Sequence, residues 1–190
     1  MSSLEKFISE EFKLLKLYSR EADNILTIEL CDYLYTSDAQ YIDKCYEKAM
    51  KIFECINYKE DELFIVANIY KEKDYNYKEK INIERYLKNK KVLKSLNCIS
   101  TDGKDVDSSV VDENEYISHY YLSCKTKDLN YKKLILDLCK HDLGFKVKRM
   151  HDYFIINKNK KICFRMMDDR FVDLIFNDLE FDKEKWINIK

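Results

Sequence analysis

The sequence predicts a single α+β domain over residues 1–190, with a mixed or mostly antiparallel sheet and helices packed on one of its sides. The chain has 190 residues, of which 46% are apolar and 14% aromatic, and this is enough to form one core. Segments with helical apolar spacing lie between short β-branched runs, a pattern typical of helices and strands that share a domain. The apolar run 63–70 has the length of a strand that is buried on both faces.

The N-terminal segment predicts a helix followed by a strand. Ser2 and Glu5 have the spacing of a capping box, which marks a helix start. Apolar residues at helical spacing then continue the predicted helix to about Tyr18. Residues 25–31 are enriched in β-branched side chains, which favours a strand.

The clearest predicted helix lies between this strand and the buried one. Ser37 and Gln40 form a second capping-box pattern, and apolar residues recur at steps of three and four as far as Ile56. The resulting apolar stripe must pack against a flat surface. The strand predicted at 63–70 would belong to the sheet that supplies this surface.

The second half of the chain predicts several shorter elements and one exposed acidic loop. Residues 83–96 indicate a short helix or a pair of helices. Residues 100–115 are acidic, small and turn-prone, with the turn dipeptide Asp102-Gly103, and predict the exposed loop. The later elements are a strand at 116–124, a helix from 131 to before 144, a hairpin of strands at 153–157 and 162–166, a strand at 172–176 and a last helix at 182–189.

Charge and cysteine usage restrict the expected partners and the cellular setting. The 34 basic and 35 acidic residues nearly cancel, so no overall field attracts nucleic acid or an anionic membrane, and neither is an expected partner. No apolar run approaches the length that crosses a bilayer. The seven cysteines are spread along the chain without a CxxC pair and are expected to be reduced. We therefore expect a cytoplasmic protein.

Motifs for cofactors and nucleophilic catalysis do not occur in the sequence. Gly103 and Gly144 are the two glycines, and neither begins a glycine-rich loop that could hold phosphate. A GxSxG nucleophile motif is absent, and no cysteine lies in an activating sequence context. We therefore expect no cofactor and do not favour an enzyme.

The densest polar cluster of the sequence lies beside the predicted hairpin. It consists of Asp168, Asp169, Arg170 and Asp173, and the nearby His141 and His151 extend it to a candidate polar site of six residues. In extended backbone, Asp169 and Asp173 would share one face, where they could bind a divalent cation or act as an acid and base pair. Alternatively, Arg170 pairs with a carboxylate and fixes the end of the strand. The sequence leaves both interpretations open.

Several segments resemble the family catalogued as domain of unknown function 3885, which comprises small proteins of Gram-positive bacteria. The resembling residues are Tyr41, Ile42, Ala49 and Phe53, the segments 62–66, 86–90, 127–132, 142–144 and 153–157, and Asp168, Asp169, Arg170 and Asp173. The resemblance extends from about Phe7 to Trp186 and implies a fold and a cellular setting, but no activity. The family pattern has a glycine directly after the Asp-Asp-Arg triplet, whereas this chain has Phe171, so the backbone there should be ordinary strand or a rebuilt turn.

Two classes of function follow from these observations. The first is a non-enzymatic protein-binding module, in its most specific form an immunity or antitoxin-like protein. Its partner would contact a tyrosine-rich surface, since the chain has 15 tyrosines, or the acidic loop at 100–115. The alternative is a metal-dependent hydrolase or nuclease that uses Asp168, Asp169 and Asp173.

Overall fold

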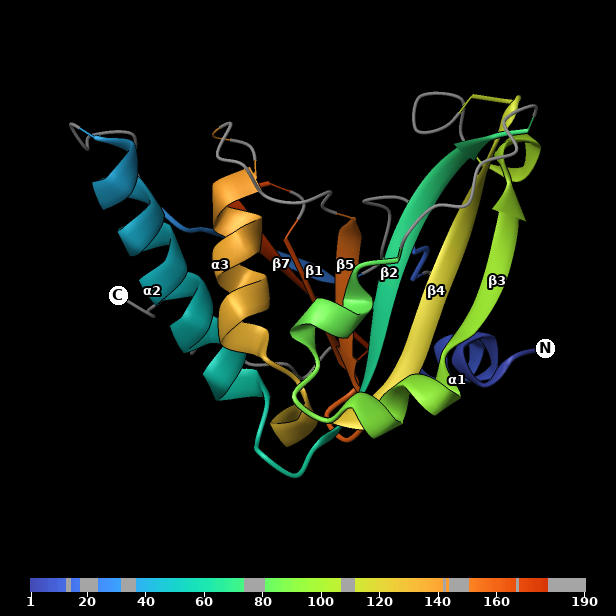
Figure 1. Ribbon diagram of the computed structural model, residues 1–190, viewed down its shortest axis with the longest axis horizontal. Helices are drawn as coiled ribbons and strands as arrows, with labels where there is room; N and C mark the ends of the chain where they lie inside the picture. Colours follow the sequence, from blue (N-terminus) through green and yellow to red (C-terminus); the bar gives the residue numbers. More distant parts are fainter. Residues whose placement is uncertain are drawn as a thin grey trace.

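A computed structural model describes the chain over residues 1–12, 15–17, 24–31, 37–73, 81–106, 112–141, 143, 151–166 and 168–177 (Figure 1). Over these described residues, seven strands form one sheet in the order β1-β7-β6-β5-β2-β4-β3, and every neighbouring pair is antiparallel. The strands are β1 (Ile25–Glu29), β2 (Glu62–Glu72), β3 (Asn97–Asp102), β4 (Glu115–Lys125), β5 (Asp152–Asn157), β6 (Ile162–Arg165) and β7 (Phe171–Phe176). The structure thus confirms the α+β class.

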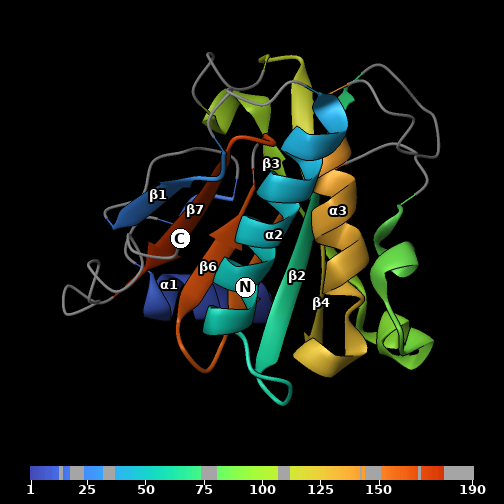
Figure 2. The ribbon, with the colours of Figure 1, turned by 90° about the vertical axis from the view of Figure 1, so that its left-hand side faces the viewer.

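Helices cover both faces of this sheet. The helices are α1 (Ser3–Glu11), α2 (Asp38–Ile56) and α3 (Tyr131–His141), with short 3₁₀-helices η1 (Ile83–Tyr86), η2 (Lys90–Ser95), η3 (Gly103–Asp105) and η4 (Thr126–Asp128). Figures 1 and 2 show α2 and α3 side by side on one face, while α1 lies on the other. The prediction that the helices share one side is therefore wrong for α1.

The alternation of side chains along β2 explains why the sheet has a hydrophobic core on each of its faces. Leu63 and Ile65 belong to the main core with α2 and α3, whereas Phe64 and Val66 belong to a second core with α1. Successive side chains of a strand point to opposite faces, so a strand that is apolar throughout must be covered twice. The run predicted at 63–70 as a strand buried on both faces is confirmed within β2.

Two segments differ from their predicted structure. The first helix ends at Glu11 rather than near Tyr18, because Phe12 is extended and the following apolar residues Leu15 and Leu17 pack against the sheet without helical backbone. Residues 100–102, predicted as part of an exposed loop, form the end of β3. Small polar residues suit an edge strand with a solvated face as well as they suit a loop, so composition alone misassigned them.

The remaining predicted elements agree with the structure where it describes them. Ser37 is the N-cap of α2, and η1 and η2 form the expected pair of short helices, although of 3₁₀ type. Phe171 begins β7 as ordinary strand, so the place of the family's glycine needs no positive φ here. Residues 107–111 of the predicted loop and the helix expected at 182–189 lie outside the described residues. Over the described part of the chain, no helix is both long and apolar enough to cross a membrane.

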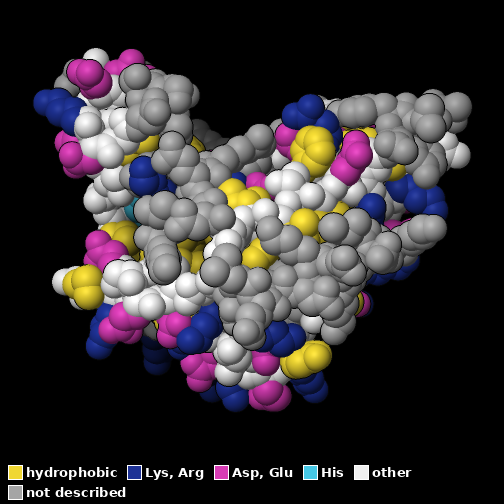
Figure 3. Space-filling view, turned by 180° about the vertical axis from the view of Figure 1, so that it is seen from behind, with side chains coloured by type: hydrophobic (Ala, Val, Ile, Leu, Met, Phe, Trp, Pro, Cys, Tyr) yellow, Lys and Arg dark blue, Asp and Glu magenta, His cyan; other side chains and the backbone are white. Residues whose placement is uncertain are grey.

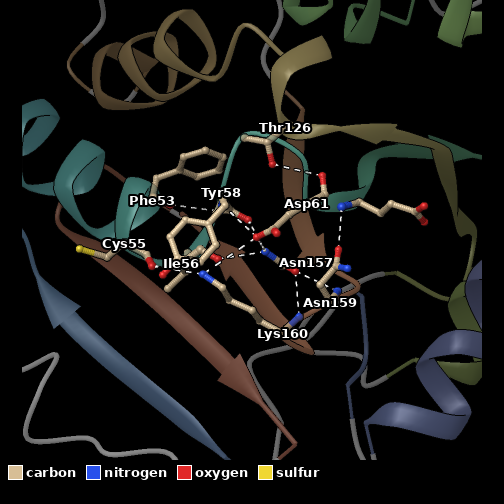
Figure 4. A network of polar contacts seen from close by, with 11 residues as sticks. Phe53, Cys55, Ile56, Tyr58, Asp61, Thr126, Asn157, Asn159 and Lys160 are labelled. Carbon is tan, nitrogen blue, oxygen red and sulfur yellow. Dashed lines mark hydrogen bonds and ion pairs between the residues drawn. The ribbon is translucent and has the colours of Figure 1, made fainter.

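A buried asparagine joins the β5–β6 hairpin to the end of α2 (Figure 4). The Asn157 amide nitrogen donates to the Ile56 carbonyl oxygen at 2.9 Å and to Asp61 Oδ2 at 2.8 Å. Its Oδ1 accepts from the backbone nitrogens of Asn159 and Lys160, each at 2.9 Å. One side chain therefore satisfies a carbonyl at the helix end and shapes the turn of the hairpin.

Candidate functional site

The candidate polar site of the sequence divides into separate parts in the structure. Asp168 forms a local pair with Arg170 before β7. Its Oδ1 accepts from the Arg170 backbone nitrogen at 2.9 Å, and its Oδ2 lies 2.6 Å from Arg170 Nη2. For this carboxylate the structure therefore supports the interpretation in which Arg170 fixes the end of the strand.

Asp169 is buried on the face covered by α2. Its carboxylate lies beside Tyr41 and Cys45 of that helix. Burial, with Cys45 and Asp169 adding to it, raises the pKa of the Tyr41 hydroxyl far above its ordinary value. Burial also raises the pKa of the Cys45 thiol to about 12, so this thiol stays protonated and is not an activated nucleophile.

Asp173 points to the opposite face of the sheet, where its partners are neighbours in register. Thr27 Oγ1 of β1 donates to Asp173 Oδ1 at 2.7 Å, and Arg165 Nη2 of β6 lies 2.7 Å from Asp173 Oδ2. Arg165 is 1% exposed and Asp173 is 7% exposed, so the ion pair is buried. The expectation that Asp169 and Asp173 share one face is wrong, because the chain bends at 168–170 instead of running extended.

The two histidines of the candidate site do not complete it. His141 is exposed at the end of α3, whereas His151 is buried, with its ring centroid 6.3 Å from that of Tyr153. Within the described ranges, no group of three or more His, Cys, Asp and Glu side chains is arranged to hold a metal ion. The six residues do not form one site.

The structure brings together a polar cluster that the sequence analysis did not identify. Asp137 of α3 accepts from the Tyr86 hydroxyl at 3.0 Å and lies 3.7 Å from Arg85 Nη2, both on η1. The Tyr86 ring packs edge-on against Tyr153 of β5, with centroids 5.5 Å apart. The Tyr153 hydroxyl is buried, and no described residue is its hydrogen-bond partner. Only the packing of three distant segments creates this cluster, so no local motif could have indicated it.

A chain of hydrogen-bonded side chains lies on the face of the sheet that α1 covers, and part of it lines a cavity. Thr101 Oγ1 lies 2.9 Å from His119 Nε2, and His119 Nδ1 lies 2.7 Å from Asn68 Oδ1. The Asn68 amide nitrogen donates to the Leu17 carbonyl oxygen. Burial lowers the pKa of His119 to about 4, so its ring is neutral at pH 7. The cavity above Thr101 and His119 has a volume of about 370 Å³ and is bounded by α1, residues 15–17 and the strands β3 and β4.

Comparison with known sequences identifies the family of this chain. The sequence pattern of the family described as "Domain of unknown function (DUF3885)" matches residues 4–183. The chain belongs to this family. The match confirms the resemblance seen in the sequence, and the description of the family assigns no activity. No curated protein and no solved structure matches the chain.

This DUF3885 protein also carries an acidic surface at the end of its longest strands. The strands β2 and β4 have 11 residues each and, with β3, curve away from the α2–α3 layer as an arm (Figure 1). Charged side chains gather on the projecting lobe at the upper left of Figure 3. We define the acidic arm tip as Glu72, Asp102, Asp105, Asp112, Glu113 and Glu115. Three lysines, Lys71, Lys73 and Lys104, lie among these six carboxylates, so the tip has a net negative charge.

Proposed function

We propose that this protein is a non-enzymatic binding module that docks a basic protein on the acidic arm tip and on the outer edge of β3. The observation that carries the proposal is the excess of carboxylates at the end of an open sheet edge. Of the six, only Glu115 is partly buried, while the other five are exposed. A basic partner would be attracted to this surface and oriented by it.

The edge strand β3 supplies the backbone part of the proposed contact. It is the last strand of the sheet and pairs only with β4 among the described strands. Asn97, Cys98, Ser100 and Asp102 are exposed along it. An extended segment can add to such an edge through main-chain hydrogen bonds. Because β3 ends at Asp102, a segment paired with it would bring its lysines and arginines to the acidic arm tip.

Tyrosines on the neighbouring strands favour a protein partner over a small cation. Tyr116 and Tyr120 of β4 are partly exposed, and the Lys71 ammonium lies 5.8 Å and 5.7 Å from their ring centroids. Tyr70 is 36% exposed. Tyrosine gives a large contact area at low entropic cost, and it is enriched in protein interfaces. The most specific form of the proposal is an immunity or antitoxin-like module that binds a basic effector protein.

The alternative of a metal-dependent hydrolase or nuclease has less support from the geometry. It requires Asp168, Asp169 and Asp173 around one site. In the structure, Asp168 pairs with Arg170 near the surface, Asp169 lies under α2, and Asp173 lies on the face of the sheet that α1 covers.

Affinity capture with matched variants tests the proposed function. In the variant Glu72→Gln, Asp105→Asn, Glu113→Gln, the changed side chains have no hydrogen bonds described in the structure, so the fold should be kept. The control Glu10→Gln, Glu29→Gln, Asp43→Asn removes three exposed carboxylates elsewhere. A partner captured from native lysate at the acidic arm tip should be retained by the unaltered chain and the control, and lost by the tip variant.

A peptide titration tests the edge contact independently of any lysate. A fluorescent peptide of alternating lysine and valine should bind with an affinity that falls as salt is added, because exposed charges are screened. A second peptide, N-methylated at alternate residues, should bind much more weakly because it cannot pair with β3 through its backbone. Equal binding of both peptides, or capture that is the same for the tip variant and the control, would contradict the proposal.

A further inference from the structure

We propose that the cavity between α1 and the strands β3 and β4 is a binding site for a small uncharged molecule with a mostly apolar body and one hydrogen-bond donor. This site is separate from the acidic arm tip and does not depend on the function proposed above. Size, wall chemistry, hydrogen bonding and charge each restrict the ligand.

The walls of the cavity are mostly apolar and suit the body of such a molecule. Ile8 and Phe12 come from α1 and its C-cap, Leu15 and Leu17 from the segment that follows, and Ile99 from β3. The volume of about 370 Å³ lies within the range of roughly 300–1,000 Å³ typical of small-molecule sites. Apolar walls with a few convergent polar groups are the usual composition of these sites.

The chain of hydrogen bonds at the cavity determines whether the ligand must donate or accept a hydrogen bond. The Leu17 carbonyl accepts from Asn68 Nδ2, so Asn68 Oδ1 faces His119 and can only accept. His119 Nδ1 therefore carries the proton, and Nε2 accepts the hydroxyl proton of Thr101. Among the described residues, no further group donates to the Thr101 hydroxyl oxygen, so this oxygen keeps a free lone pair while its proton is shared with His119. A ligand must donate a hydrogen bond to this oxygen.

The charged groups of the cavity lining argue for an uncharged ligand. The lining contains one carboxylate, Glu5, and one ammonium group, Lys16, so its formal charges cancel. The Glu5 carboxylate also accepts from the Ser2 backbone nitrogen at 2.7 Å in the capping box of α1. A cation or an anion would face a group of like charge and would lose its hydration among apolar walls.

Fluorescence titration with two matched probes tests this inference on the unaltered chain. N-phenyl-1-naphthylamine is uncharged and mostly apolar and carries one N–H donor, and its N-methyl derivative lacks the donor. We expect saturable binding of the first probe and about fivefold weaker binding of the second, which is the change for one neutral hydrogen bond. With Thr101→Val, which removes the acceptor, the two probes should bind equally. Absence of saturable binding, or equal binding of both probes to the unaltered chain, would overturn the proposal.

A pair of tryptophan variants locates the bound probe. Ile8→Trp should fill the cavity and weaken probe binding at least tenfold, because Ile8 forms part of its wall. Glu10→Trp adds the same side chain at an exposed position of α1 outside the cavity lining and should leave the affinity unchanged. Circular dichroism checks that both variants are folded. Equal effects of the two substitutions on affinity would place the probe elsewhere and overturn the assignment of the site.

Discussion

At the scale of single residues, buried polar side chains stabilise the fold by pairing with one another. Arg165 and Asp173 neutralise each other in the sheet interior, and Thr27 takes the second carboxylate oxygen. Removing one partner would leave an uncompensated buried charge, which costs about 3–5 kcal/mol. This pair is therefore a structural element of the sheet.

Two neighbouring tyrosines provide a matched test of hydrogen bonding at this scale. The Tyr86 hydroxyl is bonded to Asp137, whereas the buried Tyr153 hydroxyl has no described partner. Tyr86→Phe should lower the free energy of unfolding by about 1.5–3 kcal/mol, because it removes a hydrogen bond to a charged group. Tyr153→Phe should leave it unchanged or raise it by up to about 1 kcal/mol, because it removes a buried polar group without a bond.

Urea unfolding of the two variants and the unaltered chain measures both values. Since each substitution deletes one oxygen from a buried ring, the loss of packing is the same. A Tyr153→Phe variant that is less stable than Tyr86→Phe would show that the Tyr153 hydroxyl has an energetically important partner.

At the scale of elements, polar networks decide how neighbouring segments are joined. The hairpin β5–β6 contacts the end of α2 through Asn157, although about 100 residues separate them in the sequence. Few other side chains combine two donors and an acceptor in so small a volume. The junction therefore depends on this amide rather than on apolar packing alone.

Substitution of this asparagine tests the importance of the junction. Asn157→Ala should lower the free energy of unfolding by about 2–3 kcal/mol, since it leaves buried backbone groups without partners. Asn159→Ala, at an exposed position of the same turn, should cost less than about 1 kcal/mol, because water can replace its bond to the Glu62 backbone nitrogen. Chemical denaturation compares the two. Equal losses would contradict the central role of Asn157.

At the scale of the whole molecule, the two-sided sheet buries a histidine that affects stability as pH falls. The folded-state pKa of His119 is about 4, against about 6.5 in an unfolded chain. Between these values the unfolded chain binds the proton and the folded chain does not, so stability rises with pH. The contribution is complete above pH 6.5 and is lost as pH falls toward 4, in total about 3 kcal/mol.

Urea unfolding at several pH values tests this dependence. Between pH 7 and pH 5, the unaltered chain should lose about 2 kcal/mol more stability than His119→Gln, whose side chain does not titrate. The other titrating groups are common to both proteins and cancel in the comparison. A parallel decline of the two proteins over this range would contradict a strongly lowered pKa of His119.

The helices and strands could be predicted where local periodicity and turn residues determine them. The prediction failed where tertiary contacts determine the structure. The stripe of α2, the continuous apolar run of β2 and the β5–β6 hairpin follow from periodicity and turn signals, and all three are confirmed. The end of α1 was misplaced because Phe12 and Leu15 keep a helical spacing in the sequence, whereas in the structure both pack against the sheet without helical backbone. The strand at 97–102 was missed because an edge strand of polar residues is stabilised by its pairing with β4.

By itself, the sequence determined the α+β class, the family and most of the helix and strand positions, because these depend on apolar periodicity and capping. The tertiary structure alone decided which polar residues meet. It separated Asp168, Asp169 and Asp173, and it placed Thr101 beside His119 above a cavity. The spacing of residues in the sequence does not reveal these contacts, because residues that are far apart in the chain become neighbours only when strands pair and helices pack on the sheet.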